Sequence, residues 1–289
     1  MKKTIQMTML FFLLPFSSVM TYADEFIQSE SVATVNQKNI RFTQIISSLA
    51  SGSSCATYSW KNRGRAPAGY IKGVALSFAR SLCRVRANGS IPAAAPILSS
   101  VSSQNQHQDA LAHYQSVFSK LGINTSVPGE SPVNAIYALG MGLGMRESSG
   151  TYCEGWDVGA GSQRTSAEAE AGAFQVSYDS MAMSVELKKL YQEYRATPER
   201  CLLEVFKENV SCKARSILGT GAGAVYQSFN KACPAFATEY AMTLLRLQRT
   251  HFGPINRHEA EVAPVCLSML TAVQNIVDKD PEAACGELF

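Results

Sequence analysis

Apolar residues recur every three to four positions through most of the chain, and this spacing predicts helices. Such segments lie at residues 40–49 and 70–85, another begins near Gln108, and a strongly apolar one ends at Glu147. After Ser177 the same spacing returns at 181–191, 198–210, 225–232, 235–251 and 259–277. Alternating β-branched residues bounded by turns, which would indicate strands, are nearly absent from the sequence. The pattern therefore predicts a mainly α-helical fold.

The helix that ends at Glu147 carries the most detailed signals. Ser131 followed by Pro132 predicts its N-cap and first position. Its interior contains three glycines at alternate positions, Gly140, Gly142 and Gly144. Each glycine costs about 1 kcal/mol of helix stability relative to alanine. We therefore expect another helix to pack closely against this one, in preference to a direct role of the glycines in ligand binding.

The composition along the chain indicates how it is divided. Residues 1–23 resemble a secretory signal, with Lys2 and Lys3 followed by an apolar run too short to span a bilayer. Residues 87–108 are rich in Ser, Ala, Pro, Asn and Gln, which predicts a linker. We expect a signal peptide at 1–23, an N-terminal helical extension at 24–107 and a main domain at 108–289. No later apolar run predicts an integral membrane segment.

The net charge of the chain without its signal limits the kinds of molecule that it is expected to bind. Removal of residues 1–23 takes away Lys2 and Lys3 and no acidic residue, leaving 24 basic and 23 acidic residues. This balance argues against nucleic-acid binding, because such proteins need a basic surface. It is compatible with a neutral or mixed-charge polymer such as a glycan.

All eight cysteines lie after the signal. An even number in an exported chain predicts up to four disulfide bonds, with the pairing left open. The lysine-led signal is typical of bacteria, so we expect a periplasmic or secreted protein. The sequence has no Cys-x-x-Cys and only four scattered histidines, so we expect no metal site and no cofactor.

Glu147 is the leading candidate for catalysis. It follows an apolar helical run and precedes small turn-forming residues, so its carboxyl should lie at the exposed end of a rigid helix. Partial burial there would raise its pKa, as a general acid working near neutral pH requires. His251, at the end of a predicted helix, is interpreted as a cation near the negative end of the helix dipole.

Cleavage of a glycosidic bond needs a proton donor and a second group that stabilises the oxocarbenium-like state. The segment after Glu147 offers four acids for the second role, Glu154, Asp157, Glu168 and Glu170. It also contains Tyr152 and Trp156, whose rings could stack on sugars. Taken singly, each acid is more simply a solvated surface residue, and the segment a surface loop pinned by Cys153.

The segments Arg146-Glu147-Ser148-Ser149-Gly150 and Gly172-Ala173-Phe174-Gln175-Val176 resemble the Glu-Ser and Gly-Leu-Met-Gln motifs of the lysozyme-like superfamily. Soluble lytic transglycosylases and goose-type lysozymes have the most similar patterns. The resemblance implies a lysozyme-like helical domain with disulfides that cleaves peptidoglycan between N-acetylmuramic acid and N-acetylglucosamine. It implies Glu147 as the acid/base, Gln175 as a groove residue, and Ser148 and Ser149 beside the site.

The chain departs from this pattern in three places. The loop between the motifs is longer than usual. Ser177 stands where goose-type lysozymes carry an Asp, and their other auxiliary Asp would fall near Asp157. The late Tyr-Asn-Ala-Gly type motif has no clear counterpart. An inactive secreted glycan-binding or structural protein on the same scaffold therefore stays an alternative, and hydrolysis, anhydro-sugar formation and oligomeric state stay open.

Overall fold

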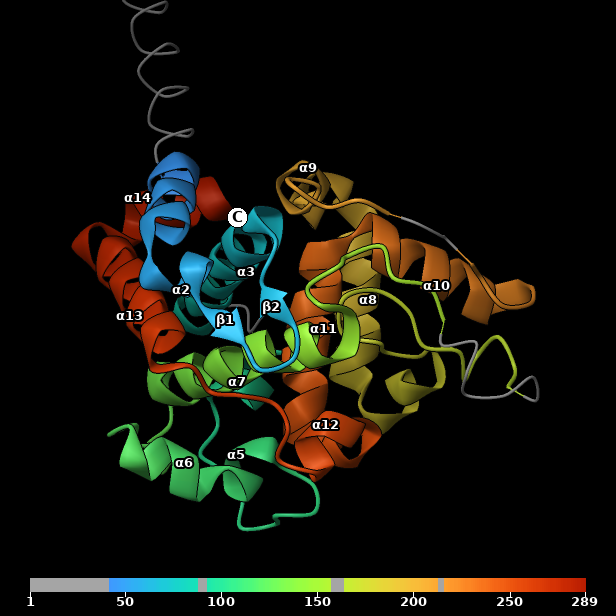
Figure 1. The fold of residues 1–289 in the computed structure, drawn as a ribbon, viewed down its shortest axis with the longest axis horizontal. Helices are drawn as coiled ribbons and strands as arrows, with labels where there is room; N and C mark the ends of the chain where they lie inside the picture. The colour runs from blue at the N-terminus through green and yellow to red at the C-terminus, as the bar shows by residue number, and fades with distance from the viewer. Residues whose placement is uncertain (1–41, 88–92, 157–163, 213–215) are drawn as a thin grey trace, which may run out of the picture.

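The computed structural model describes residues 42–87, 93–156, 164–212 and 216–289, so the expected signal peptide lies outside the described residues. The fold is mainly helical, and Figure 1 shows the arrangement of its elements. The helices are 42–52, α2 (Ser54–Thr57), α3 (Ala68–Arg86), α4 (Ala95–Ser99), α5 (Ala110–His113), α6 (Gln115–Lys120), α7 (Glu130–Ser148), α8 (Val185–Ala196), α9 (Leu203–Phe206), α10 (Gly221–Ala232), α11 (Pro234–Leu247), α12 (Gly253–Asn256), α13 (Pro264–Lys279) and α14 (Pro281–Leu288). Short 3-10 turns are η2 (Asp179–Met183), η3 (Pro198–Cys201) and η4 (Arg249–His251).

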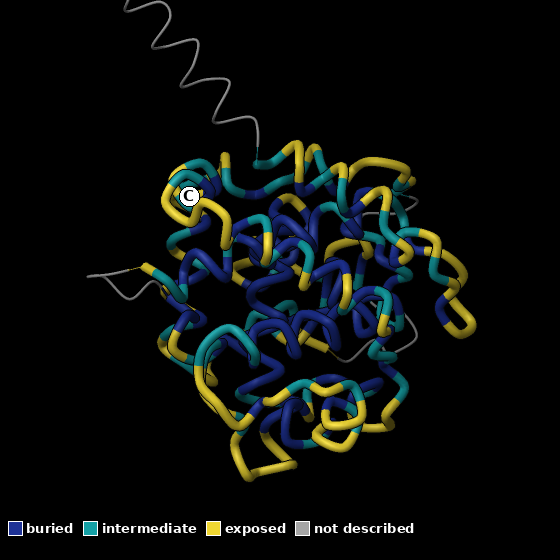
Figure 2. Tube along the Cα trace, turned by 90° about the vertical axis from the view of Figure 1, so that its left-hand side faces the viewer, coloured by how far each residue is buried: buried dark blue, intermediate teal, exposed yellow. Residues whose placement is uncertain are grey.

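Helix α7 lies in the interior and packs against α3, α4, α11 and α13 (Figure 1). Its three glycines permit these contacts. A Cβ atom on Gly140 would lie 2.2 Å from the sulfur of Met242 on α11, and one on Gly144 would lie 2.2 Å from the hydroxyl of Tyr70 on α3. A Cβ atom on Gly142 would lie 2.0 Å from the carbonyl oxygen of Glu261, in the segment before α13. The predicted close packing is therefore confirmed, and Figure 2 shows a buried interior beneath an exposed rim.

The segment predicted to be a linker is partly ordered as a helix. It contains α4, whose Leu98 is fully buried. The guanidinium of Arg246, on α11, pairs with Asp109 at 3.0 Å and donates to the carbonyl oxygens of Ile97 and Leu98. These partners are distant in sequence, so local composition could not reveal the order.

Several element boundaries differ from the prediction. Helix α7 begins at Glu130 behind Gly129 (φ 116°), and the hydroxyl of Ser131 donates to the carbonyl of Asn124 instead of capping the helix. Helix α13 begins at Pro264, later than predicted, and α14 was not predicted. The sequence also gave no sign of the antiparallel pair β1 (Ser59–Trp60) and β2 (Gly64–Arg65).

Four disulfides form, as predicted, and no described cysteine is free. The pairs are Cys55–Cys266, Cys83–Cys285, Cys153–Cys212 and Cys201–Cys233. The first two join the region before residue 107 to the end of the chain, while the expected boundary at 107 stays a prediction. Among the described residues, every helix is too short or too polar to cross a bilayer.

Candidate active site

Glu147 lies one residue before the end of α7, where the chain turns sharply. Ser149 adopts a left-handed conformation (φ 57°), and its N–H donates to the carbonyl of Met145 at 3.0 Å. Gly150 (φ 76°) likewise donates to the carbonyl of Gly144 at 3.1 Å. Left-handed residues in this position end a helix and satisfy its last carbonyl groups. The carboxyl of Glu147 therefore projects from a rigid helix end.

Ser148 joins this helix end to the second motif. Its buried hydroxyl lies 2.8 Å from the carbonyl oxygen of Ala173 and accepts the N–H of Thr151 at 3.0 Å. The Ser148 side chain thus holds the two halves of the site together, although they are separated by more than twenty residues in sequence.

Gln175 closes a tight turn in which Ala171 and Val176 form an antiparallel bridge. It adopts φ 48°, and its amide Nε2 donates to the carbonyls of Gly172 at 3.0 Å and Gly155 at 3.2 Å. Gln175 is only 7% exposed. Its two hydrogen bonds hold the loop after Glu147 against the turn.

A cleft of about 410 Å³ opens in front of Glu147. A volume of this size is typical of small-molecule and substrate sites. Its walls come from the hairpin formed by β1 and β2, the end of α7, the loop that follows α7 and the turn at Gln175. They are formed by Arg63, Glu147, Ser148, Ser149, Glu154, Gly155, Trp156, Glu170 and Gln175.

The structure brings some predicted site residues together and separates others. Ser148, Trp156 and Gln175 line the cleft with Glu147. Tyr152 is buried and does not line it, and Ser177 is buried with its hydroxyl donating to Asp179 at 2.5 Å.

Of the four acids proposed for the second role, Glu154 and Glu170 line the cleft. Glu168 is exposed in a neighbouring cleft. Asp157 lies outside the described residues. Glu154 and Glu170 are therefore the acids that line the described part of the cleft, and a role for Asp157 stays a prediction.

The pKa of Glu147 is raised from 4.5 to about 7. Burial of the carboxyl is the largest cause, because it disfavours the charged form. The negative charge of Glu170 raises the pKa further, and three positive charges oppose the rise, those of Arg257, Arg63 and Arg146. A substantial fraction of Glu147 therefore keeps its proton at neutral pH, as proton donation requires.

Glu170 separates this cleft from the neighbouring one of about 390 Å³. Arg164 Nη1 lies 3.5 Å from one carboxylate oxygen of Glu170, and His251 Nε2 lies 3.7 Å from the other. His251 Nε2 is also 3.3 Å from the carbonyl oxygen of Gln175. Burial lowers the pKa of His251, which favours the neutral ring and argues against its interpretation as a helix-end cation.

The sequence analysis missed Arg63. It belongs to a short basic segment, Lys61 to Arg65, that carries no recognisable motif. Only the folding of the hairpin toward the end of α7 places it in the cleft.

Among the described residues, no group of three or more His, Cys, Asp or Glu side chains is arranged to hold a metal ion. Comparison of the chain with models of protein families, with curated proteins and with solved structures finds no match. The residues of the cleft and the two sequence motifs are therefore the features that indicate a function for this chain.

Proposed function

We propose that this chain is an exported glycosidase, a muramidase or lytic transglycosylase, that cleaves the β-1,4 bond between N-acetylmuramic acid and N-acetylglucosamine in peptidoglycan. The observation that carries the proposal is a half-buried carboxyl, that of Glu147, in a cleft with its pKa raised to about 7. The motif resemblance, the four disulfides and the signal-like N-terminus support it.

In the proposed reaction, protonated Glu147 donates its proton to the oxygen that joins the two sugars. The bond between that oxygen and C1 breaks, and the oxygen keeps the electron pair and the proton. The positive charge that develops at C1 is stabilised by a carboxylate, for which Glu170 and Glu154 line the cleft, or by the sugar's own N-acetyl group. The Glu147 carboxylate then takes a proton from the group that attacks C1, which is water in hydrolysis or the sugar's own 6-hydroxyl in anhydro-sugar formation, and so regains its acid form. Trp156 offers an aromatic surface for a sugar ring.

The Glu147→Gln substitution tests this function. It keeps the shape and hydrogen bonding of the side chain but removes the proton to be donated. General acid catalysis contributes about 10²–10⁴-fold, so release of sugar ends from purified sacculi should fall by that factor or more. Glu168→Gln is the matched control, since Glu168 lies in the same loop but outside the cleft. Identification of the sugar ends released by the wild type also separates hydrolysis from anhydro-sugar formation.

Stability distinguishes a catalytic Glu147 from a structural one. Because folding raises its pKa from 4.5 to about 7, the folded state loses stability as the pH rises through that range. Glu147→Gln should therefore be more stable than the wild type at pH 8, by about 1–3 kcal/mol, and equal to it below pH 4.5. A variant that melts early but still digests sacculi at the wild-type rate would mean that Glu147 is structural and that another group donates the proton. A wild-type protein that releases no sugar ends from sacculi would leave the inactive-scaffold alternative standing.

A further inference from the structure

The turn between β1 and β2 brings a basic residue from the N-terminal region into the candidate active site. Arg63 lines the same cleft as Glu147 and Trp156. The turn is tight, with Asn62 at φ 60° and Gly64 at φ 68°, and the N–H of Arg63 donates to the carbonyl of Trp60 at 3.0 Å.

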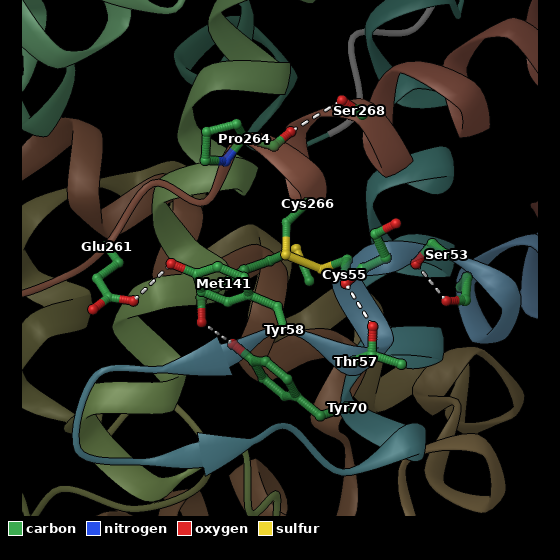
Figure 3. Close-up of a disulfide and its surroundings, with 12 residues drawn as sticks. Ser53, Cys55, Thr57, Tyr58, Tyr70, Met141, Glu261, Pro264, Cys266 and Ser268 are labelled. Carbon is green, nitrogen blue, oxygen red and sulfur yellow. Dashed lines mark hydrogen bonds between the residues drawn. A yellow bond between two sulfur atoms is a disulfide. The ribbon is translucent and has the colours of Figure 1, made fainter.

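The hairpin is held firmly against the wall of the site. The disulfide Cys55–Cys266 anchors the chain just before it, and the hydroxyl of Tyr58 donates to the Glu261 carboxylate at 3.4 Å (Figure 3). The N–H of Lys61 donates to the same carboxylate at 3.1 Å. The Glu261 backbone packs against α7 at Gly142, so the hairpin and the Glu147 helix share a rigid support.

The guanidinium of Arg63 is itself positioned, because its Nη2 donates to the carbonyl oxygen of Arg146. A guanidinium has further N–H groups on its other edges. The exposed side chain lies at the cleft wall, so these groups are accessible to a ligand.

The other two arginines near Glu147 form ion pairs and share one carboxylate. Arg146 and Arg257 each lie 3.0 Å from Glu259. For Arg63, the described residues supply no ion pair. Its positive charge also lowers the pKa of Glu147 and so opposes the protonated form that a general acid needs. A positive charge without an ion pair at the wall of a cleft is well placed to bind an anionic group of a ligand.

We propose that Arg63 binds a carboxylate carried by the glycan beside the bond that is cleaved. The inference rests on the proposed function and deepens it, since it makes an anionic glycan, rather than a neutral one such as chitin, the preferred substrate. Two sources supply this carboxylate: the lactyl group of a peptide-free strand, or the peptide stem of an intact one. Guanidinium groups bind carboxylates through two parallel hydrogen bonds, which also fixes the orientation of the sugar.

Binding of the anion has a consequence for the acid. A carboxylate on Arg63 cancels the positive charge that lowers the pKa of Glu147, so Glu147 is more fully protonated with such a substrate than in the free protein. A neutral chitooligosaccharide has no such effect. The anionic substrate is therefore favoured in two ways: Arg63 binds it more tightly, and a larger fraction of Glu147 is protonated when it is bound.

The experiment compares Arg63→Gln with wild type on three substrates: chitooligosaccharides, peptide-free glycan strands prepared with an amidase, and intact sacculi. We expect kcat/KM to fall by about 10–100-fold on the substrate whose carboxylate Arg63 binds, either the peptide-free strands or the intact sacculi, as loss of a charged hydrogen bond implies. Cleavage of chitooligosaccharides should change by less than about threefold. Arg65→Gln, two residues along the same hairpin but outside the cleft, should match the wild type on all three.

The pattern of loss identifies the source of the carboxylate. Loss confined to peptide-free strands assigns the lactyl group, and loss confined to intact sacculi assigns the peptide stem. An equal loss on chitooligosaccharides would overturn the proposal, because Arg63 would then only shape the cleft. Matching melting curves for Arg63→Gln and Arg65→Gln exclude a general loss of folding.

A binding measurement separates this proposal from the proposed function. The Glu147→Gln protein and the double variant Glu147→Gln/Arg63→Gln are titrated with chitooligosaccharides and with peptide-free strands, at low and high salt. We expect Arg63 to strengthen binding only to the strands, and less so at high salt. If the wild type cleaves nothing but this preference is found, the proposed function fails and the Arg63 site stands. Equal binding of both ligands by both proteins overturns the Arg63 site.

Discussion

The pKa of Glu147 is set by opposing contributions from burial and from a few charged neighbours. Burial and the charge of Glu170 raise its pKa, while nearby arginines lower it, with a result of about 7. A group with this pKa loses its proton as the pH rises through neutrality, so catalysis by its acid form should decline over the same range.

Removal of the Glu170 charge should move this decline. Glu170→Gln eliminates a contribution that raises the pKa of Glu147, so the alkaline limb of the pH–activity profile should shift to lower pH. It should not reach the ordinary value of 4.5, because burial continues to raise the pKa. The pH dependence of kcat/KM on peptidoglycan fragments measures the shift.

Glu154→Gln is the control for this shift, since Glu154 lines the same cleft but is not among the largest influences on the Glu147 pKa. Its alkaline limb should stay in place. If the alkaline limb of the Glu170→Gln profile stays near pH 7, a group other than Glu147 controls the pH dependence of kcat/KM.

The sequence was informative about single residues where the signal is local. Glu147, Ser148 and Gln175 stand next to helix ends and turns that the pattern of small residues marks, and all three line one cleft. Arg63 gave no signal, because its role depends on where a distant hairpin folds. His251 was misinterpreted for a similar reason: its burial is produced by residues far away in sequence.

At the scale of elements, the glycine-bearing helix α7 is the support of the site. The periodicity of apolar residues predicted this helix and its close packing, because both are encoded within one segment. It could not predict β1 and β2, since two-residue strands are too short to show alternation. Nor could it predict the order of α4, which depends on hydrogen bonds from Arg246 on α11.

Gly142→Ala tests the close packing of α7. Alanine is the better helix former, but its Cβ would lie 2.0 Å from the backbone oxygen of Glu261, which cannot move alone. We expect a net loss of about 1–3 kcal/mol in the free energy of unfolding, measured by urea denaturation.

Gly286→Ala, in α14, is the matched control for this substitution. No atom lies within 4 Å of its added Cβ, so the helix should gain up to about 1 kcal/mol. A Gly142→Ala protein as stable as Gly286→Ala would contradict the described packing of α7 against Glu261.

At the scale of the whole molecule, two disulfides join the beginning of the described chain to its end. Cys55–Cys266 spans 211 residues and Cys83–Cys285 spans 202. In the chain-entropy description each closure of this length stabilises the folded state by up to about 5 kcal/mol, and nearly equal spans give nearly equal effects. The two bonds differ in what they anchor: the first precedes the hairpin that carries Arg63, and the second joins α3 to α14.

This difference allows stability and site geometry to be separated. The pairs Cys55→Ala/Cys266→Ala and Cys83→Ala/Cys285→Ala should lower the free energy of unfolding by similar amounts, because they open loops of similar length. Only the first pair releases the anchor of the hairpin, so only it should weaken the preference for carboxylate-bearing glycans over chitooligosaccharides. Urea denaturation and paired kcat/KM measurements, made where both variants remain folded, check the two expectations. An equal change in substrate preference in both variants would mean that the position of Arg63 depends on overall stability, and not on the bond beside its hairpin.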